Sequence, residues 1–95
     1  MTGMSRTSDG LDTRRKRLLY RSWHRGMREM DLIMGKFADA EIGEMSEVDL
    51  DHFEELSDLP DADLYDWIAN NADVPAQYDT ALLKRLRAFH HGRHV

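Results

Sequence analysis

Apolar residues follow a helical period along this chain, and that feature constrains the fold most strongly. In the clearest segment, residues 28–42, apolar side chains fall at i, i+3, i+4, i+7 and i+8, which places them on one helix face. They are Met30, Ile33, Met34, Phe37 and Ala38. No segment alternates apolar and polar residues as a half-buried strand does. Because 95 residues suffice for one domain only, the sequence predicts a small all-α domain.

Start and stop signals divide the chain into five short helices. The first begins near residue 12, and the expected stops, where the backbone turns easily, are Gly26, Gly43 and Asn70-Asn71. The later starts are a capping box at Ser46 and Asp49, a cap at Asp61 after the Leu59-Pro60 break, and Pro75. We therefore expect a five-helix bundle over residues 12–90, a disordered segment at 1–11 and a frayed basic tail at 91–95.

Charge is distributed unevenly along the chain. Residues 1–28 carry eight Lys or Arg and two Asp or Glu, residues 29–83 carry one and sixteen, and residues 84–95 carry four and none. The three segments have charges of +6, −15 and +4, which make the net charge of −5. This asymmetry predicts either that oppositely charged segments meet in the fold or that each faces a different partner.

Several classes of protein are disfavoured by what the sequence lacks. Without cysteine there is no disulfide or thiolate metal site, which fits a reducing compartment. No apolar run reaches the length of a membrane span, and the first dozen residues do not resemble a signal peptide. The isolated glycines form no phosphate-binding loop, and neither a zinc-binding helix nor a nucleophile elbow occurs. We expect a cytoplasmic protein with no catalytic constellation.

Other clusters have both an ordinary and a functional interpretation. His90, His91 and His94 could share a metal, but we expect a solvated basic end, and we expect the many carboxylates to serve solubility on polar helix faces. Met30 and Met34 are expected in the core rather than in a recognition groove. The basic cluster at residues 14–17 favours a nucleic-acid-binding helix, whereas the acidic centre of the chain disfavours it.

The most informative segment is residues 24–29, which we call the signature turn: His24, Arg25, Gly26, Met27, Arg28 and Glu29. In one interpretation Gly26 supplies the backbone turn, Arg25 caps the first helix and Glu29 opens the second. In the other, the sharp turn projects Arg25 and Glu29 into solvent as a rigid polar knob that binds a partner.

The signature turn resembles the R-G-x-x-E motif of the SdhE-type succinate dehydrogenase flavinylation factors, a family of FAD assembly factors. The similarity extends to neighbouring segments in family order, from about Arg14 to Phe89: residues 18–24, Met30-Asp31-Leu32, Phe37-Ala38, residues 60–67 and residues 82–86. At His24 many family members have a basic residue instead, and histidine is mostly neutral at pH 7.

The resemblance implies a five-helix bundle that is an assembly factor rather than an enzyme. Such factors bind the flavoprotein subunit of succinate dehydrogenase, in some cases that of fumarate reductase, and promote covalent attachment of FAD to a histidine of that subunit. By resemblance the partner-binding residues are those of the signature turn, with Arg25 and Glu29 near the flavin site of the partner. We also expect a monomer with no cofactor of its own, which neither enters a membrane nor binds nucleic acid, in the bacterial cytoplasm or the mitochondrial matrix.

Overall fold

A computed structural model describes residues 9–92, and within this range the chain forms five α-helices, two short 3₁₀ helices and no strand. The α-helices are α1 (Thr13–Trp23), α2 (Arg28–Glu41), α3 (Glu47–Ser57), α4 (Asp61–Ile68) and α5 (Ala81–Gly92). The 3₁₀ helices are η1 (Ile42–Glu44) and η2 (Ala76–Tyr78). The predicted all-α, five-helix fold is therefore confirmed.

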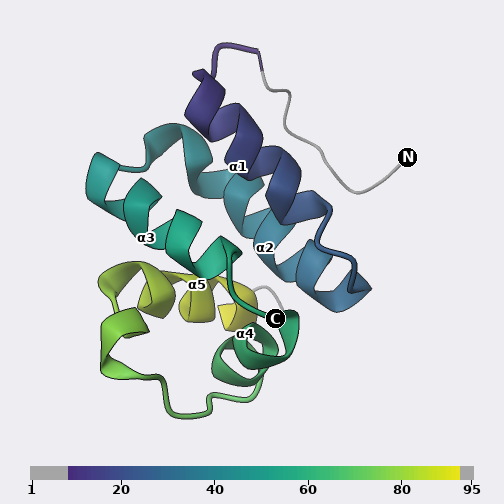
Figure 1. Cartoon of the computed structure of the whole chain (residues 1–95), viewed down its shortest axis with the longest axis vertical. Coiled ribbons are helices and arrows are strands. Elements are labelled where there is room, and N and C mark those ends of the chain that lie inside the picture. Colours follow the sequence, from purple (N-terminus) through teal and green to yellow (C-terminus); the bar gives the residue numbers. More distant parts are fainter. Residues whose placement is uncertain (1–8, 93–95) are drawn as a thin grey trace.

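The helices form two groups that share one core (Figure 1). Helix α1 lies along α2, and α3 also packs against α1. Helices α4 and α5 pack together, and both contact α2. Each α-helix contributes buried apolar side chains to the core, among them Leu18, Phe37, Phe53, Leu64 and Leu86. The two methionines expected inside, Met30 and Met34, are fully buried.

The contact between α1 and α2 depends on a glycine within a helix. The indole ring of Trp23 lies against Gly35, and a Cβ atom at residue 35 would stand 2.3 Å from Cδ2 of that ring. The ring is held in place because its Nε1 donates a hydrogen bond to Oδ1 of Asp39 at 3.1 Å. Only a residue without a side chain allows the helices this approach.

Of the three later helix starts, one is confirmed and two are wrong. The Ser46 hydroxyl accepts a hydrogen bond from the Asp49 amide at 3.1 Å, as a capping residue does. Before α4 the cap position belongs to Pro60, and Asp61 is already helical, so its carboxylate is available for another contact. Pro75 precedes η2 rather than opening the last helix, because that turn separates it from α5.

The true start of α5 is set by Thr80, whose hydroxyl accepts a hydrogen bond from the Leu83 amide at 3.2 Å. The helix runs to Gly92 and thus includes two residues that we expected in the frayed tail. At the other end, Leu11 packs against the core. The rest of the expected terminal segments, residues 1–8 and 93–95, lies outside the described residues. No described helix combines the length and apolarity that crossing a membrane requires.

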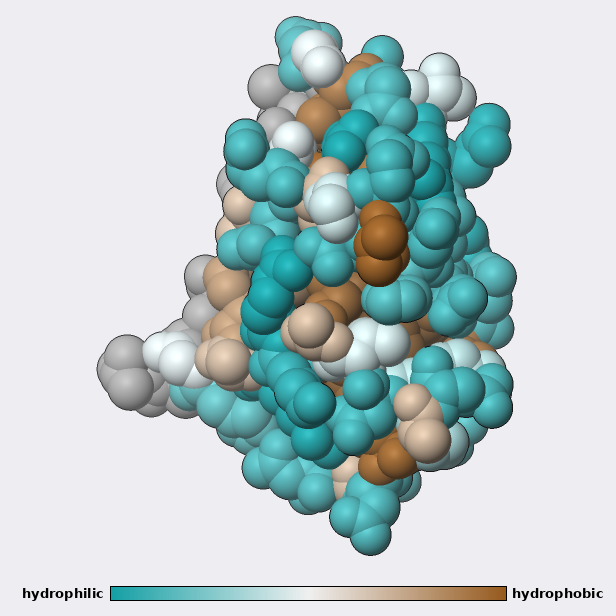
Figure 2. Space-filling view, turned by 90° about the vertical axis from the view of Figure 1, so that its left-hand side faces the viewer, coloured by the Kyte–Doolittle hydropathy of each residue, from teal (hydrophilic) through white to brown (hydrophobic). Residues whose placement is uncertain are grey.

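The oppositely charged segments do meet in the fold. Arg14 of α1 forms ion pairs with three carboxylates of α3, and Arg85 of α5 pairs with carboxylates of α2 and α3. On the face in Figure 2, hydrophilic residues predominate and hydrophobic ones are scattered. The carboxylates between residues 29 and 83 therefore include internal partners of the arginines as well as solvated groups.

Candidate functional site

The signature turn joins α1 to α2, and its shape depends on Gly26. The φ angle of Gly26 is +104°, a conformation that residues with side chains rarely adopt. Nothing lies within 4 Å of the place where a Cβ would stand, so the surface above Gly26 is open. The backbone therefore requires glycine here, and the open space leaves room for another chain to approach.

Arg25 points into the molecule, with 8% of its side chain exposed. Its Nε donates to Oδ1 of Asp61 at 2.6 Å, and its two terminal nitrogens donate to the carbonyl oxygens of Ser57 (2.9 Å) and Leu59 (2.8 Å). Its backbone amide donates to Oδ1 of Asp31 at 2.6 Å. The guanidinium thus connects the signature turn to the segment between α3 and α4.

Both expectations for the geometry of Arg25 are therefore wrong. Its side chain does not project into solvent, because α3 and α4 offer it a carboxylate and two carbonyl oxygens. It does not cap α1 either, since His24 occupies that position and its amide donates to the Arg21 carbonyl oxygen at 3.3 Å. Arg25 instead sets the position of the turn relative to the second half of the bundle.

The exposed part of the signature turn consists of His24, Gly26, Arg28 and Glu29. Glu29 lies in the first turn of α2, as predicted, where a carboxylate is favoured by the helix dipole. Arg28 and Glu29 have no ion pair among residues 9–92. Met27 is half-buried and packs against the core. The turn therefore presents one unpaired cation and one unpaired carboxylate around an open glycine.

Tyr20 extends this surface along α1 and was missed by the sequence argument. It is 60% exposed, and its ring stacks on that of His24 with the centroids 3.9 Å apart. The Nδ1 atom of His24 lies 2.7 Å from the Tyr20 carbonyl oxygen, which fixes the imidazole orientation. Because residues four apart at the end of a helix are neighbours on its surface, the spacing of Tyr20 and His24 could have predicted this contact.

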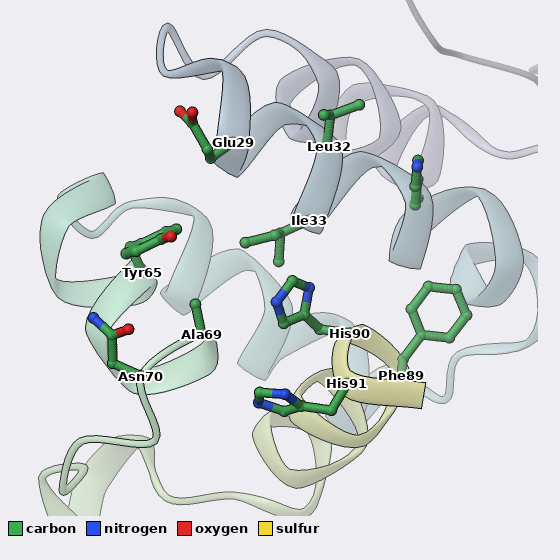
Figure 3. A pocket seen from close by; sticks show the side chains of 10 residues that line it. Glu29, Leu32, Ile33, Tyr65, Ala69, Asn70, Phe89, His90 and His91 are labelled. Carbon is green, nitrogen blue, oxygen red and sulfur yellow. The ribbon is translucent and has the colours of Figure 1, made fainter. Parts of the chain in front are cut away.

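A pocket of about 620 Å³ opens beside the turn, between α2, α4 and α5 (Figure 3). It is lined by Glu29, Leu32, Ile33, Lys36, Tyr65, Ala69, Asn70, Phe89, His90 and His91. Glu29 therefore belongs both to the signature turn and to the pocket. The lining has one permanently cationic side chain, Lys36, so a diphosphate would find a single counter-charge there.

The histidines of α5 are part of this pocket rather than of a frayed end. The Nε2 atom of His91 lies 2.9 Å from the Ile68 carbonyl oxygen and donates to it, which ties α5 to the end of α4. His90 and His91 are thus helical rather than frayed, although His91 is exposed, while His94 lies outside the described residues. Within residues 9–92 no three His, Cys, Asp or Glu side chains are arranged to hold a metal.

Half of the basic cluster of α1 is engaged inside the protein. Arg14 binds carboxylates of α3, and Arg15 donates to the carbonyl oxygens of Ile42 (2.9 Å) and Met45 (2.6 Å). A nucleic-acid backbone needs several free cations on one surface. Since two of the four basic side chains in residues 14–17 have internal partners, the structure does not support the nucleic-acid alternative.

The chain is similar in sequence to known proteins. Residues 16–90 match the family model described as flavinator of succinate dehydrogenase. The chain is 42% identical over 77 residues to succinate dehydrogenase assembly factor 2, mitochondrial, of Dictyostelium discoideum, covering 81% of this chain and 53% of that protein. The protein of the same name from Debaryomyces hansenii is 39% identical over 71 residues, covering 75% of this chain and 50% of that protein.

A bacterial relative, FAD assembly factor SdhE of Acetobacter pasteurianus, is 35% identical over 78 residues, covering 82% of this chain and 72% of that protein. The chain spans about half the length of the Dictyostelium and Debaryomyces relatives. The matched region contains the signature turn, helices α2 to α4, most of α1 and α5, and every lining residue of the pocket except His91. With a family model covering most of its length, the chain belongs to the family of flavinators of succinate dehydrogenase.

Proposed function

We propose that this protein is an assembly factor that binds the flavoprotein subunit of succinate dehydrogenase and promotes its covalent flavinylation by FAD. The observation that carries the proposal is the signature turn, a rigid exposed corner held from beneath by Arg25. Membership of the family and the names of the relatives, which refer to succinate dehydrogenase and to FAD assembly, support the proposal.

The mechanism requires no reactive group in this chain. If the factor binds best to the flavoprotein conformation in which FAD and its acceptor histidine are aligned, it raises the population of that conformation. The bond between them then forms within the partner, where alignment itself accelerates the reaction. A hundredfold acceleration needs only about 2.7 kcal/mol of differential binding, which one charged corner and a few apolar contacts can supply.

We assign the contact with the partner to the exposed residues of the turn. Arg28 and Glu29 provide charge-assisted hydrogen bonds, and Gly26 allows close approach of the partner backbone. The stacked rings of His24 and Tyr20 add an aromatic surface. Arg25 and Met27 support the turn rather than contact the partner, because their side chains face the protein interior.

The proposal also covers the oligomeric state, a second target enzyme, the cofactor and the cellular compartment. The factor acts as a monomer, serves the fumarate reductase flavoprotein by the same contacts where that enzyme is present, and carries no FAD itself. It works in the compartment where the flavoprotein acquires FAD, which is the bacterial cytoplasm or the mitochondrial matrix.

Gene deletion followed by in-gel flavin fluorescence tests the proposal. We expect the succinate dehydrogenase flavoprotein band to lose its covalent flavin, and we expect the wild-type gene to restore it. Glu29→Ala should restore little, whereas Glu55→Ala, which removes an exposed carboxylate outside the signature turn, should restore it fully. Unchanged flavin fluorescence in the deletion strain would overturn the proposed function.

A further inference from the structure

The α2 side of the pocket has a simple pattern. Glu29, Leu32, Ile33 and Lys36 line it and stand at i, i+3, i+4 and i+7, which places them on one helix face. The two apolar residues thus lie between a carboxylate and an ammonium group. Seven residues of α-helix advance about 10 Å, so the two charges are too far apart to pair with each other. Neither has an ion pair among residues 9–92.

The opposite wall comes from the second half of the bundle. Tyr65 and Ala69 of the α4 region and His90 of α5 face Ile33 across the opening, with Phe89 to one side (Figure 3). The volume of about 620 Å³ falls in the range of sites that enclose a ligand. The pocket therefore combines an apolar centre with an unpaired negative charge at one end and an unpaired positive charge at the other.

We propose that this pocket receives an extended segment of the flavoprotein partner, which places an apolar side chain between α2, α4 and α5. A basic residue of that segment pairs with Glu29 and an acidic residue pairs with Lys36. An extended chain advances about 3.3 Å per residue, and its alternate side chains point to the same face. The two charged residues are therefore about four positions apart, with the apolar one midway between them. This inference rests on the proposed function, because it takes its partner from there.

The separation of the charges favours a polypeptide over a small molecule. A free amino acid carries its opposite charges on atoms a few bonds apart and cannot span about 10 Å of helix, whereas an extended peptide segment of about five residues spans it. A diphosphate cofactor fits poorly, since Lys36 would be its only permanent counter-charge and Glu29 would repel it. The pocket thus continues the interface that begins at the signature turn, with Glu29 common to both.

Affinity measurements with the purified flavoprotein subunit test the inference without altering the signature turn. We expect Lys36→Glu, at an exposed position, to weaken binding by about tenfold or more, because it places a like charge opposite the acidic residue of the segment. Ala69→Phe fills the pocket and should weaken binding at least as strongly. The matched controls are Lys84→Glu and Ala88→Phe, at exposed positions outside the pocket lining, and both should stay within about twofold of wild type.

Thermal unfolding of each variant identifies losses that come from misfolding, and Lys36→Glu, at a surface position, decides the outcome if Ala69→Phe fails to fold. If Lys36→Glu and a folded Ala69→Phe bind as wild type does while Glu29→Ala binds weakly, the pocket inference is wrong and the proposed function stands. If wild-type protein does not bind the flavoprotein subunit, both are wrong.

Discussion

Two arginines of the signature turn, three residues apart, have opposite environments. Arg25 is buried and donates to one carboxylate and two carbonyl oxygens, whereas Arg28 is exposed and has no ion pair among residues 9–92. A buried acceptor that loses its partner keeps its desolvation cost, while an exposed charge is solvated either way. The first arginine therefore contributes to stability and the second is available for binding.

This difference predicts distinct effects of the same substitution. Arg25→Ala should lower the free energy of unfolding by about 2–3 kcal/mol, because Asp61 and two carbonyl oxygens lose their donor. Arg25→Lys should recover only part of the lost free energy of unfolding, since an ammonium group cannot serve all three acceptors with the geometry of a guanidinium. Chemical denaturation monitored by circular dichroism measures both.

Arg28→Ala is the matched control for Arg25→Ala. It should change the free energy of unfolding by less than about 0.5 kcal/mol, as is usual for a surface substitution without partners, yet weaken binding to the flavoprotein. Equal stability losses for the two arginine variants would contradict the assignment of Arg25 as the internal member of the pair.

At the scale of the helices, the packing of α1 on α2 depends on the space above Gly35. Alanine in a helix interior is ordinarily favoured over glycine by about 1 kcal/mol. Here the added methyl group would collide with the Trp23 indole. The hydrogen bond from the indole to Asp39 restricts movement of the ring. Overpacking of this kind costs about 3 kcal/mol, so the steric effect exceeds the gain in helix propensity.

We therefore predict that Gly35→Ala lowers the free energy of unfolding by about 2 kcal/mol, the overpacking cost less the propensity gain. Gly92→Ala is the control, because a Cβ at residue 92 meets nothing within 4 Å and the residue lies in the last turn of α5. Thermal and urea unfolding of both variants provide the comparison. A Gly35→Ala protein as stable as wild type would show that the indole can shift at little cost.

The elements also show what the sequence can and cannot predict. Helix faces and the Ser46 cap follow from residues within one or two turns of each other, so period and spacing identify them. The Arg25–Asp61 pair joins residues 36 positions apart, and nothing local distinguishes an arginine that turns inward from one that faces solvent. The pocket has the same origin, because its α2 face is visible in the sequence but its other walls depend on how α4 and α5 pack.

For the molecule as a whole, the uneven charge of the sequence becomes a set of contacts between helices. Arg14 connects α1 to the α3 carboxylates Glu47, Asp51 and Glu54. Its hydrogen bond to Glu54 is the main reason that the pKa of this carboxyl lies below its usual value of 4.5. The basic first helix is therefore held against the acidic centre of the chain, and the contact with Glu54 is strongest when that carboxyl is ionised.

Acid should therefore weaken the contact between α1 and α3. A carboxyl whose pKa is lower in the folded than in the unfolded state stabilises the fold above the unfolded value, about 4.5 for Glu54, and loses this contribution as pH falls through the folded value. We predict that Glu54→Gln lowers the midpoint of thermal unfolding at pH 7 and that its difference from wild type shrinks below pH 4.5. Glu55→Gln, at an exposed neighbour without an ion pair among residues 9–92, should differ little from wild type at either pH. A Glu54→Gln deficit that stays constant from pH 7 to pH 3 would contradict a contribution that depends on ionisation of the Glu54 carboxyl.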